Sequence, residues 1–388
     1  MSELGETVSI LHDLIAFPTV SAWSNLEMIA YLAERLERAG ARVTLYQDDT
    51  GQKANLFASL GPEEQGGIVL SGHSDVVPAQ GPDWTSDPFE MVEDKGLLYG
   101  RGTCDMKGFI AAATAMAPFY AERRLSRPIH FAFTYDEEVG CLGARNLVDE
   151  LKARDIRPEI AIIGEPTSMQ IVEGHKGCHE YTAEFCGLAG HGSAPDRGVN
   201  AAEYASRYVA RLLQLREALK GRAPANSRFD PPWTTINIGR ISGGVAHNVI
   251  ADRAEVEWEM RPVQASDAIF VLEDLHAYCQ EDLLPAMRAV EPEAAILTHV
   301  IGEVCGLEPA DENAARALVA ELTGNNGAEV VPFGTEAGLF QEMGMSAVLC
   351  GPGSIEQAHK PDEYVAISQL EICLDMLKAL GERLEPAA

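Results

Sequence analysis

Apolar and polar positions alternate along the first 175 residues as short apolar runs separated by amphipathic stretches. Residues 26–39 carry apolar side chains at helical spacing and stop at Gly40, which predicts an amphipathic helix. Short β-rich runs predict five strands, at residues 42–46, 55–60, 68–71, 129–134 and 160–163. Helical patterns at 106–116 and 144–151 separate the later runs. Buried strands that alternate with helices predict an α/β sheet with parallel strands.

The rhythm changes between residues 180 and 305. There the pattern predicts, in order, a strand at 181–185, a helix at 201–219, strands at 234–241 and 248–260, a helix at 267–287 and a strand at 294–301. This βαββαβ order is typical of a ferredoxin-like unit. The α/β pattern then resumes, with a helix at 313–322, strands at 330–332 and 347–350, and a terminal helix at 367–384. We therefore predict a discontinuous domain of residues 1–179 and 306–388, with an inserted domain of residues 180–305.

Charge and composition narrow the range of functions. The 388 residues include 59 acidic and 30 basic side chains, a formal net charge of −29, which disfavours binding to nucleic acid or to an anionic membrane. The N-terminus lacks the basic region of a signal peptide, and the longest apolar stretch, about 109–119, is too short to span a bilayer. Eight scattered cysteines without a Cys-x-x-Cys pair indicate reduced thiols, so we expect a cytoplasmic protein.

Polar residues gather where the predicted strands end. In open α/β sheets, ligands bind beyond the carboxyl ends of the strands. The residues at such positions are His73 and Asp75 after strand 68–71, Asp105 before helix 106–116, Asp136, Glu137 and Glu138 after strand 129–134, Glu165 after strand 160–163, and His359 after strand 347–350. The sequence therefore predicts that two histidines and several carboxylates meet at one edge of the sheet.

Each cluster alone has a simpler reading. Residues 136–138 could form the first turn of a helix, His359 could be a surface histidine, and Gly100-x-Gly102 could begin a dinucleotide loop, although Asp105 stands where its third glycine would be. Together, imidazole and carboxylate groups without thiolate favour a hydrolytic site for two metal ions, most simply Zn²⁺, with Co²⁺ or Mn²⁺ tolerated. Asp75 is spaced to accept a hydrogen bond from the His73 ring. A carboxylate left over from metal binding would act as general base.

Five ordered motifs carry a resemblance to a known family. They are SGHSDVVP (71–78), GRGTCDMKG (100–108), TYDEEVG (134–140), GEPTS (164–168) and GPGSIEQAHKPDEYV (351–365). In these motifs the chain resembles the M20 family of metallo-aminoacylases and exopeptidases. The resemblance implies a zinc-peptidase-like α/β/α catalytic domain with an inserted ferredoxin-like lid and dimerisation domain. It also implies a cis peptide bond after Asp105.

The same resemblance assigns roles to individual residues. His73 and Glu165 would bind one metal ion, Glu138 and His359 the other, and Asp105 would bridge them. Glu137 would be the catalytic base, and Asp75 would orient His73.

Three residues of the inserted domain match family positions. His191 would reach the active site of a partner subunit in a homodimer, although its motif reads His-Gly-Ser where the family usually has Ser after His. Asn248 and Arg261 would bind the α-carboxylate of a small N-acyl amino acid, a group that suits the guanidinium fork. Arg261 could otherwise be a plain surface arginine at a strand end.

The motifs GTEAGLFQ (334–341) and GPGSIEQAHKPDEY indicate an activity within the family. They imply removal of the acetyl group from N2-acetyl-L-ornithine, a step of arginine biosynthesis that yields L-ornithine and acetate. Glu336 would then hold the δ-ammonium of the substrate. Other family activities stay open: desuccinylation of succinyl-diaminopimelate, deacetylation of N-acetylcitrulline, and dipeptidase or carboxypeptidase activity. A non-catalytic binding protein is disfavoured, because it would have no use for Glu137.

Overall fold

The computed structural model describes residues 2–79, 81 and 83–386, which divide into two compact units. Unit 1 comprises Met1–Gly174, Pro309–Val330 and Thr335–Ala388, and unit 2 comprises His175–Glu308 with Val331–Gly334. The segment predicted as an insertion, 180–305, lies inside unit 2. Unit 1 is therefore built from both ends of the chain.

Unit 1 contains an eight-stranded mixed sheet. Its strands lie in the order β1 (Arg42–Gln47), β2 (Ala54–Leu60), β6 (Ile129–Thr134), β3 (Ile68–His73), β7 (Ile160–Pro166), β16 (Ser346–Gly351), β8 (Val172–His175) and β15 (Glu329–Val331). The central pairs β6–β3, β3–β7 and β7–β16 are parallel. The pairs β1–β2, β2–β6 and β16–β8 are antiparallel, so the prediction of parallel strands was wrong for the outer part of the sheet. Only residues 48–53 join β1 to β2, too few for the crossover that a parallel pair requires.

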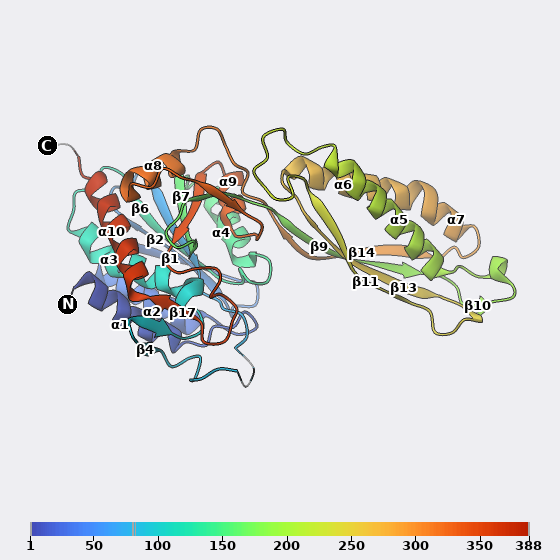
Figure 1. Cartoon of the computed structure of the whole chain (residues 1–388), viewed down its shortest axis with the longest axis horizontal. Coiled ribbons are helices and arrows are strands. Elements are labelled where there is room, and N and C mark those ends of the chain that lie inside the picture. The colour runs from blue at the N-terminus through green and yellow to red at the C-terminus, as the bar shows by residue number, and fades with distance from the viewer. Residues whose placement is uncertain (1, 80, 82, 387–388) are drawn as a thin grey trace. The chain divides into compact units, whose positions relative to one another are not determined.

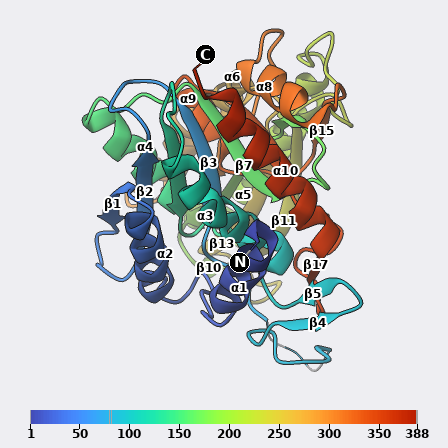
Figure 2. The same cartoon turned by 90° about the vertical axis from the view of Figure 1, so that its left-hand side faces the viewer.

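Helices cover both faces of this sheet (Figure 2). One face carries α1 (Glu3–Ile15), α2 (Leu26–Arg38), α3 (Gly108–Ala121), α8 (Ala314–Thr323) and α10 (Ile367–Arg383), and the other carries α4 (Leu142–Ala153) and α9 (Ala337–Glu342). Helix α3 is apolar almost all round because it packs between the sheet and the pair α1 and α10. A small sheet of β17 (Tyr364–Ala366), β5 (Leu97–Tyr99) and β4 (Val92–Asp94) completes the unit.

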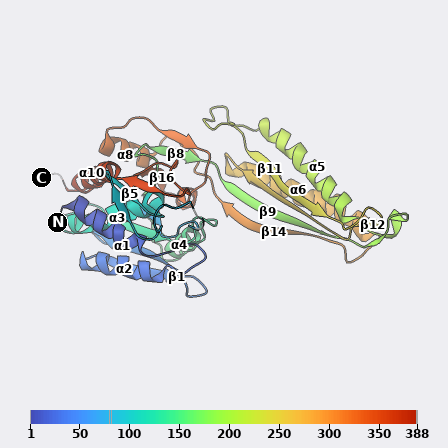
Figure 3. The ribbon, with the colours of Figure 1, turned by 60° about the horizontal axis from the view of Figure 1, so that its bottom comes forward.

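Unit 2 is a four-stranded antiparallel sheet with helices on one face (Figures 1 and 3). The strand order is β11 (Thr235–Gly243), β13 (Arg253–Arg261), β9 (Cys178–Cys186) and β14 (Ala295–Val304), and the helices are α5 (Ala201–Lys220), α6 (Ala265–Tyr278) and α7 (Leu284–Arg288). This order and connectivity are those of a ferredoxin-like fold. Alternate residues of β9 and β13 face the helices, and Tyr181 stacks on Trp258 in the core between them.

Two predicted elements of unit 2 are broken in the structure. The strand predicted at 248–260 divides into β12 (Val249–Ile250) and β13, and β12 pairs with β10 (Gly190–His191) outside the main sheet. The helix predicted at 267–287 divides into α6, a wider turn η3 (Cys279–Leu283) and α7, with Pro285 in the first turn of α7. Among the described residues, no helix combines the length and apolarity that crossing a membrane would require.

Candidate metal centre

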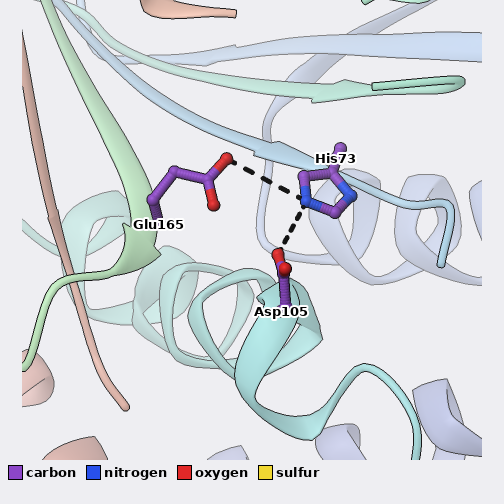
Figure 4. Close-up of side chains that lie close together, drawn as sticks. All are labelled: His73, Asp105 and Glu165. Carbon is purple, nitrogen blue, oxygen red and sulfur yellow. Dashed lines mark hydrogen bonds and ion pairs between the residues drawn. The ribbon is translucent and has the colours of Figure 1, made fainter. Parts of the chain in front are cut away.

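The first group of candidate ligands lies at the carboxyl end of the central strands (Figure 4). His73 is the last residue of β3, Glu165 lies near the end of β7, and Asp105 belongs to the turn η1 (Thr103–Lys107) that leads into α3. The His73 Nε2 atom is 3.0 Å from Asp105 Oδ1 and 4.0 Å from Glu165 Oε1. All three side chains are buried.

A second group shares Asp105 with the first. The His359 Nε2 atom lies 3.4 Å from Asp105 Oδ2 and 3.1 Å from the Glu138 carboxylate. Asp105 therefore turns one carboxylate oxygen toward each histidine. Within each group the candidate ligand atoms lie within 4.8 Å of one another. Two ions that share one carboxylate would fit this arrangement.

Backbone features present these side chains at the sheet edge. Gly164 lies against the ring of Phe109, where an added Cβ would come within 1.9 Å of a ring carbon, so Glu165 can follow only a glycine here. The loop after β6 has positive φ angles at Asp136 (54°) and Cys141 (55°), which turn it sharply around Glu137 and Glu138. The Asp105–Met106 peptide bond is cis, as the family resemblance implies.

Asp75 does not contact His73 in the predicted way. The His73 Nδ1–H donates to the main-chain carbonyl of Asp75 at 2.9 Å, while the Asp75 carboxylate is 3.7 Å away. That carboxylate instead accepts from the Ser21 hydroxyl (2.7 Å) and from the amides of Glu137 (3.0 Å) and Glu138 (3.4 Å). The main-chain carbonyl thus holds the Nδ1 side of the His73 ring and leaves Nε2 directed at Asp105, while the Asp75 carboxylate positions the Glu137–Glu138 loop.

Opposing charges dominate the electrostatics of the centre. Burial alone would lower the pKa of His73, but the hydrogen bond and charge of Asp105, with Glu137 and Glu165, raise it well above its usual value. Hydrogen bonds to Asp105 and Glu138 raise the pKa of His359 to about 10. Burial would raise the pKa of Asp105, yet its hydrogen bonds with both histidines lower it.

The remaining carboxylates carry the opposite shift. Burial and neighbouring negative charge raise the pKa values of Glu137 and Glu165 well above the usual value. The same causes also raise the pKa of Glu138. Each would ionise readily only beside added positive charge. Without a cation, the protein holds four acidic groups close together with two histidines to balance them.

The residues fit divalent metal ions. Glu165 Oε1 is buried and has no hydrogen-bond partner among the described residues, which is costly for a carboxylate oxygen unless a cation lies beside it. The donor set of two imidazoles and three carboxylates, without thiolate, suits zinc and also accepts cobalt or manganese.

Glu137 stands beside both groups without belonging to either. Its amide is held by Asp75, and the Cys141 thiol lies 3.6 Å from its carboxylate. The preceding Asp136 forms an ion pair with Lys53, whose ammonium also donates to the Ser21 carbonyl. These contacts fix the loop while leaving a carboxylate next to the predicted metal position, as a general base requires.

The structure places Glu336, the residue expected to hold a substrate ammonium, inside the fold. This side chain is fully buried, and its two oxygens accept hydrogen bonds from the hydroxyls of Ser71 (2.6 Å) and Thr134 (2.7 Å). Burial raises its pKa. Glu336 therefore joins β3 to β6, and its role toward a substrate ammonium stays a prediction.

The three predicted residues of unit 2 lie at strand ends: His191 ends β10, Asn248 immediately precedes β12, and Arg261 ends β13. His191 is exposed, and its Nδ1 accepts from the Ser193 amide at 3.2 Å, so the proton of the neutral ring is on Nε2. Gly192 donates to the main-chain carbonyl of Asn248, and an added Cβ would lie 3.1 Å from that backbone, so a side chain here would require the Asn248 backbone to shift slightly. The Arg261 guanidinium donates two hydrogen bonds to the carboxylate of Glu259 on the same strand.

One buried carboxylate in the centre's framework was missed from the sequence. Glu363, in the same motif as His359, is buried and accepts hydrogen bonds from the loop that carries Asp105. Glu363 lies four residues after His359 in the motif GPGSIEQAHKPDEYV, and this position was the sequence signal that could have identified it.

Comparison with known proteins identifies relatives of the chain. The model of peptidase family M20/M25/M40 matches residues 69–383. An acetylornithine deacetylase of Proteus mirabilis strain HI4320 is 36% identical over 382 residues, which cover 97% of this chain and 96% of that protein.

Solved structures share the fold at lower identity. An M20 family metallo-carboxypeptidase of Sulfolobus solfataricus superimposes with a TM-score of 0.72 at 17% identity, covering 97% of this chain and 98% of that one. A dinuclear metal-binding M20 family peptidase of Bacillus subtilis superimposes with a TM-score of 0.64 at 19% identity, covering 99% of each chain. The eight-stranded sheet and the smaller antiparallel sheet correspond to the catalytic and lid domains of these proteins. The chain belongs to the M20 peptidase family of metallohydrolases.

Proposed function

We propose that this chain is a zinc-dependent amidohydrolase that converts N2-acetyl-L-ornithine and water to L-ornithine and acetate. The observation that carries the hydrolytic part is the pair of ligand groups that share Asp105, with Glu137 beside them. The substrate rests on the 36% identity to an acetylornithine deacetylase along nearly the whole of both chains.

Five side chains would hold the two metal ions. His73 and Glu165 would bind one ion, Glu138 and His359 the other, and each oxygen of Asp105 would face one of them. When bound, such ions lower the pKa of a water molecule and polarise the amide carbonyl. The Bacillus subtilis relative, described as dinuclear, supports a centre for two ions.

Glu137 would carry the proton through the reaction. Its carboxylate removes a proton from the attacking water as the new C–O bond forms at the acetyl carbon. It then delivers that proton to the nitrogen as the C–N bond breaks, so that ornithine leaves with a neutral amine and acetic acid remains. The acid then loses its remaining proton to give acetate, and the released amine takes up a proton to become an ammonium group. The Asp75 hydrogen bond to the Glu137 amide holds the base in place during both transfers.

The lid residues would complete the site in a homodimer. His191 of one subunit would present its Nε2–H to the carbonyl oxygen of a substrate bound to the other, stabilising the negative charge that develops there. Arg261 and Asn248 would bind the substrate α-carboxylate, and Arg261 would give up its hydrogen bonds to Glu259 to do so.

Turnover on matched substrates tests the proposal. Protein loaded with Zn²⁺, Co²⁺ or Mn²⁺ should hydrolyse N2-acetyl-L-ornithine with a higher kcat/KM than N-acetylcitrulline, N-succinyl-diaminopimelate or a dipeptide. A clear preference for another of these would reassign the substrate within the family. No hydrolysis of any of them by metal-loaded protein would overturn the enzymatic proposal itself.

A further inference from the structure

One buried glutamate connects the two loops that carry the shared ligand and the most exposed ligand. The Glu363 carboxylate accepts from the amides of Gly102 (3.1 Å), Cys104 (2.9 Å) and Asp105 (3.0 Å), and from the Arg101 guanidinium (2.6 Å). Its own carbonyl accepts from the Gly100 amide at 2.9 Å. A single residue thus accepts hydrogen bonds from most main-chain amides of the 100–105 loop.

The Glu363–Arg101 pair is buried on both sides. Their side chains are 0% and 3% exposed, and the guanidinium also lies over the ring of Trp84. A buried carboxylate with four donors is held in one position, because leaving any of these groups unpaired is costly. The same loop is tied a second time, since the Cys104 thiol contacts the Ser354 carbonyl at 3.3 Å.

The two ligand groups depend differently on this connection. His73 and Glu165 lie on β3 and β7, whose hydrogen-bonded ladder sets their spacing. Glu138 and His359 both lie on loops, and His359 is 52% exposed. His359 is four residues before Glu363, so the contacts of Glu363 with the Asp105 loop fix the approach of His359 to Asp105.

We propose that Glu363 is a positioning residue for the second metal ion, the one held by Asp105, Glu138 and His359. Its loss would loosen His359 relative to Asp105 while the strands still hold the first group. The inference rests on the proposed two-metal function and deepens it, by making the affinities of the two ions separately adjustable.

The test is a Co²⁺ titration of the metal-free, full-length protein, followed by calorimetry and by visible absorption. The wild type should bind two equivalents. Glu363→Gln should bind the first equivalent as the wild type does and the second about tenfold or more weakly, the usual cost of removing a group that orients ligands. Its absorption spectrum should then saturate in two well-separated stages.

A control variant separates positioning from simple destabilisation. Glu173 on β8 is also buried and pairs with Arg316 at 2.5 Å, on elements that carry none of the candidate ligands. Glu173→Gln should melt at a lower temperature yet bind both equivalents normally. If Glu363→Gln does not unfold cooperatively, Glu363→Asp, which keeps the charge but shortens the reach, should show the same selective loss.

The outcomes distinguish this inference from the proposed function. Unchanged binding of both equivalents by the Glu363 variants, or equal weakening of both, would overturn the positioning role. A wild-type protein that binds fewer than two equivalents would instead refute the two-metal centre on which the proposed function depends.

Discussion

The carboxylate of Asp75 accepts a hydrogen bond from the main-chain amide of Glu137 at 3.0 Å, so a residue two positions after the candidate ligand His73 positions the candidate base. The Asp75 carboxylate accepts hydrogen bonds from the main-chain amides of Glu137 and Glu138. In Asp75→Asn, the side-chain NH₂ group should face one of these two N–H donors. This mismatch should lower kcat about ten- to a hundredfold with little change in KM or metal content. Steady-state kinetics and metal analysis check this, with Ser21→Ala, which removes only one donor, as a milder comparison. Loss of metal along with activity would point to a ligand-orienting role instead.

Glu137 is expected to matter for chemistry and not for metal binding. Glu137→Ala, or →Asp with its shorter reach, should retain both ions and lose about 10³-fold or more in kcat, because no other described group is placed to carry the proton. Metal content by mass spectrometry and single-turnover rates measure the two effects separately. Retained turnover in a metal-replete Glu137→Ala protein would remove the base assignment.

Exchange of subunits tests the proposed role of His191. His191→Ala and Glu137→Ala homodimers should each be nearly inactive. A re-formed equal mixture should recover about a quarter of wild-type activity, because half of its dimers are mixed and each mixed dimer contains one complete site. A mixture that stays inactive, or a fully active monomer on a sizing column, would show that His191 does not act across a subunit boundary.

Removal of metal should lower stability as well as activity. Burial and neighbouring carboxylates raise the pKa values of Glu137 and Glu165, so without a cation these groups must take up protons to avoid repulsion. Metal binding removes this cost, and it stabilises the folded state in proportion to the logarithm of free metal over its dissociation constant. Dialysis against a chelator should abolish turnover and lower the melting temperature, and Zn²⁺ should restore both. A melting temperature that is indifferent to metal would argue against a metal-binding centre here.

Acid should destabilise the fold through His130. Burial between the Ser59 hydroxyl and the Gly66 carbonyl lowers its pKa to about 4, so the unfolded chain takes up a proton near pH 6.5 while the folded one does not. The stability that the neutral ring contributes is present above pH 6.5 and is lost as the pH falls toward 4. Between pH 7 and pH 5 the loss should be about 2 kcal/mol.

Urea denaturation at both pH values, compared with a His130→Gln variant, measures this contribution. The variant should show a smaller pH dependence than the wild type, by that amount. If the unfolding free energies of the wild type and the variant fell equally between pH 7 and pH 5, the His130 ring would be protonated inside the folded protein.

The parts of the fold that followed from the sequence were those with strong periodicity. The apolar runs of β3, β6 and β7 are buried on both faces and could be placed within a few residues. Helix α1 was not predicted, although Ile10, Leu11 and Leu14 recur at helical spacing. The antiparallel outer strands could not be inferred from runs of apolar residues, since strand direction depends on connections.

The candidate site was predictable in composition and less so in contacts. The sequence indicated which histidines and carboxylates gather at the sheet edge, because strand ends determine that. It did not indicate that Asp75 uses its carbonyl for His73, since main-chain and side-chain acceptors of one residue differ by small rotations. The burial of Glu336 depends on hydroxyls of two neighbouring strands, Ser71 and Thr134, which no local motif reveals.

The insertion of the lid into unit 1 has a consequence for biosynthesis. Apart from residues 331–334, unit 2 is one continuous segment, whereas Glu138 meets His359 across 221 residues and Arg101 meets Glu363 across 262. During translation the ferredoxin-like unit can therefore close its core while the larger sheet still lacks β16 and α10. We expect the nascent chain to acquire its second ligand group only when almost all of it has left the ribosome. Truncations near the C-terminus would consequently abolish hydrolysis while leaving a folded lid.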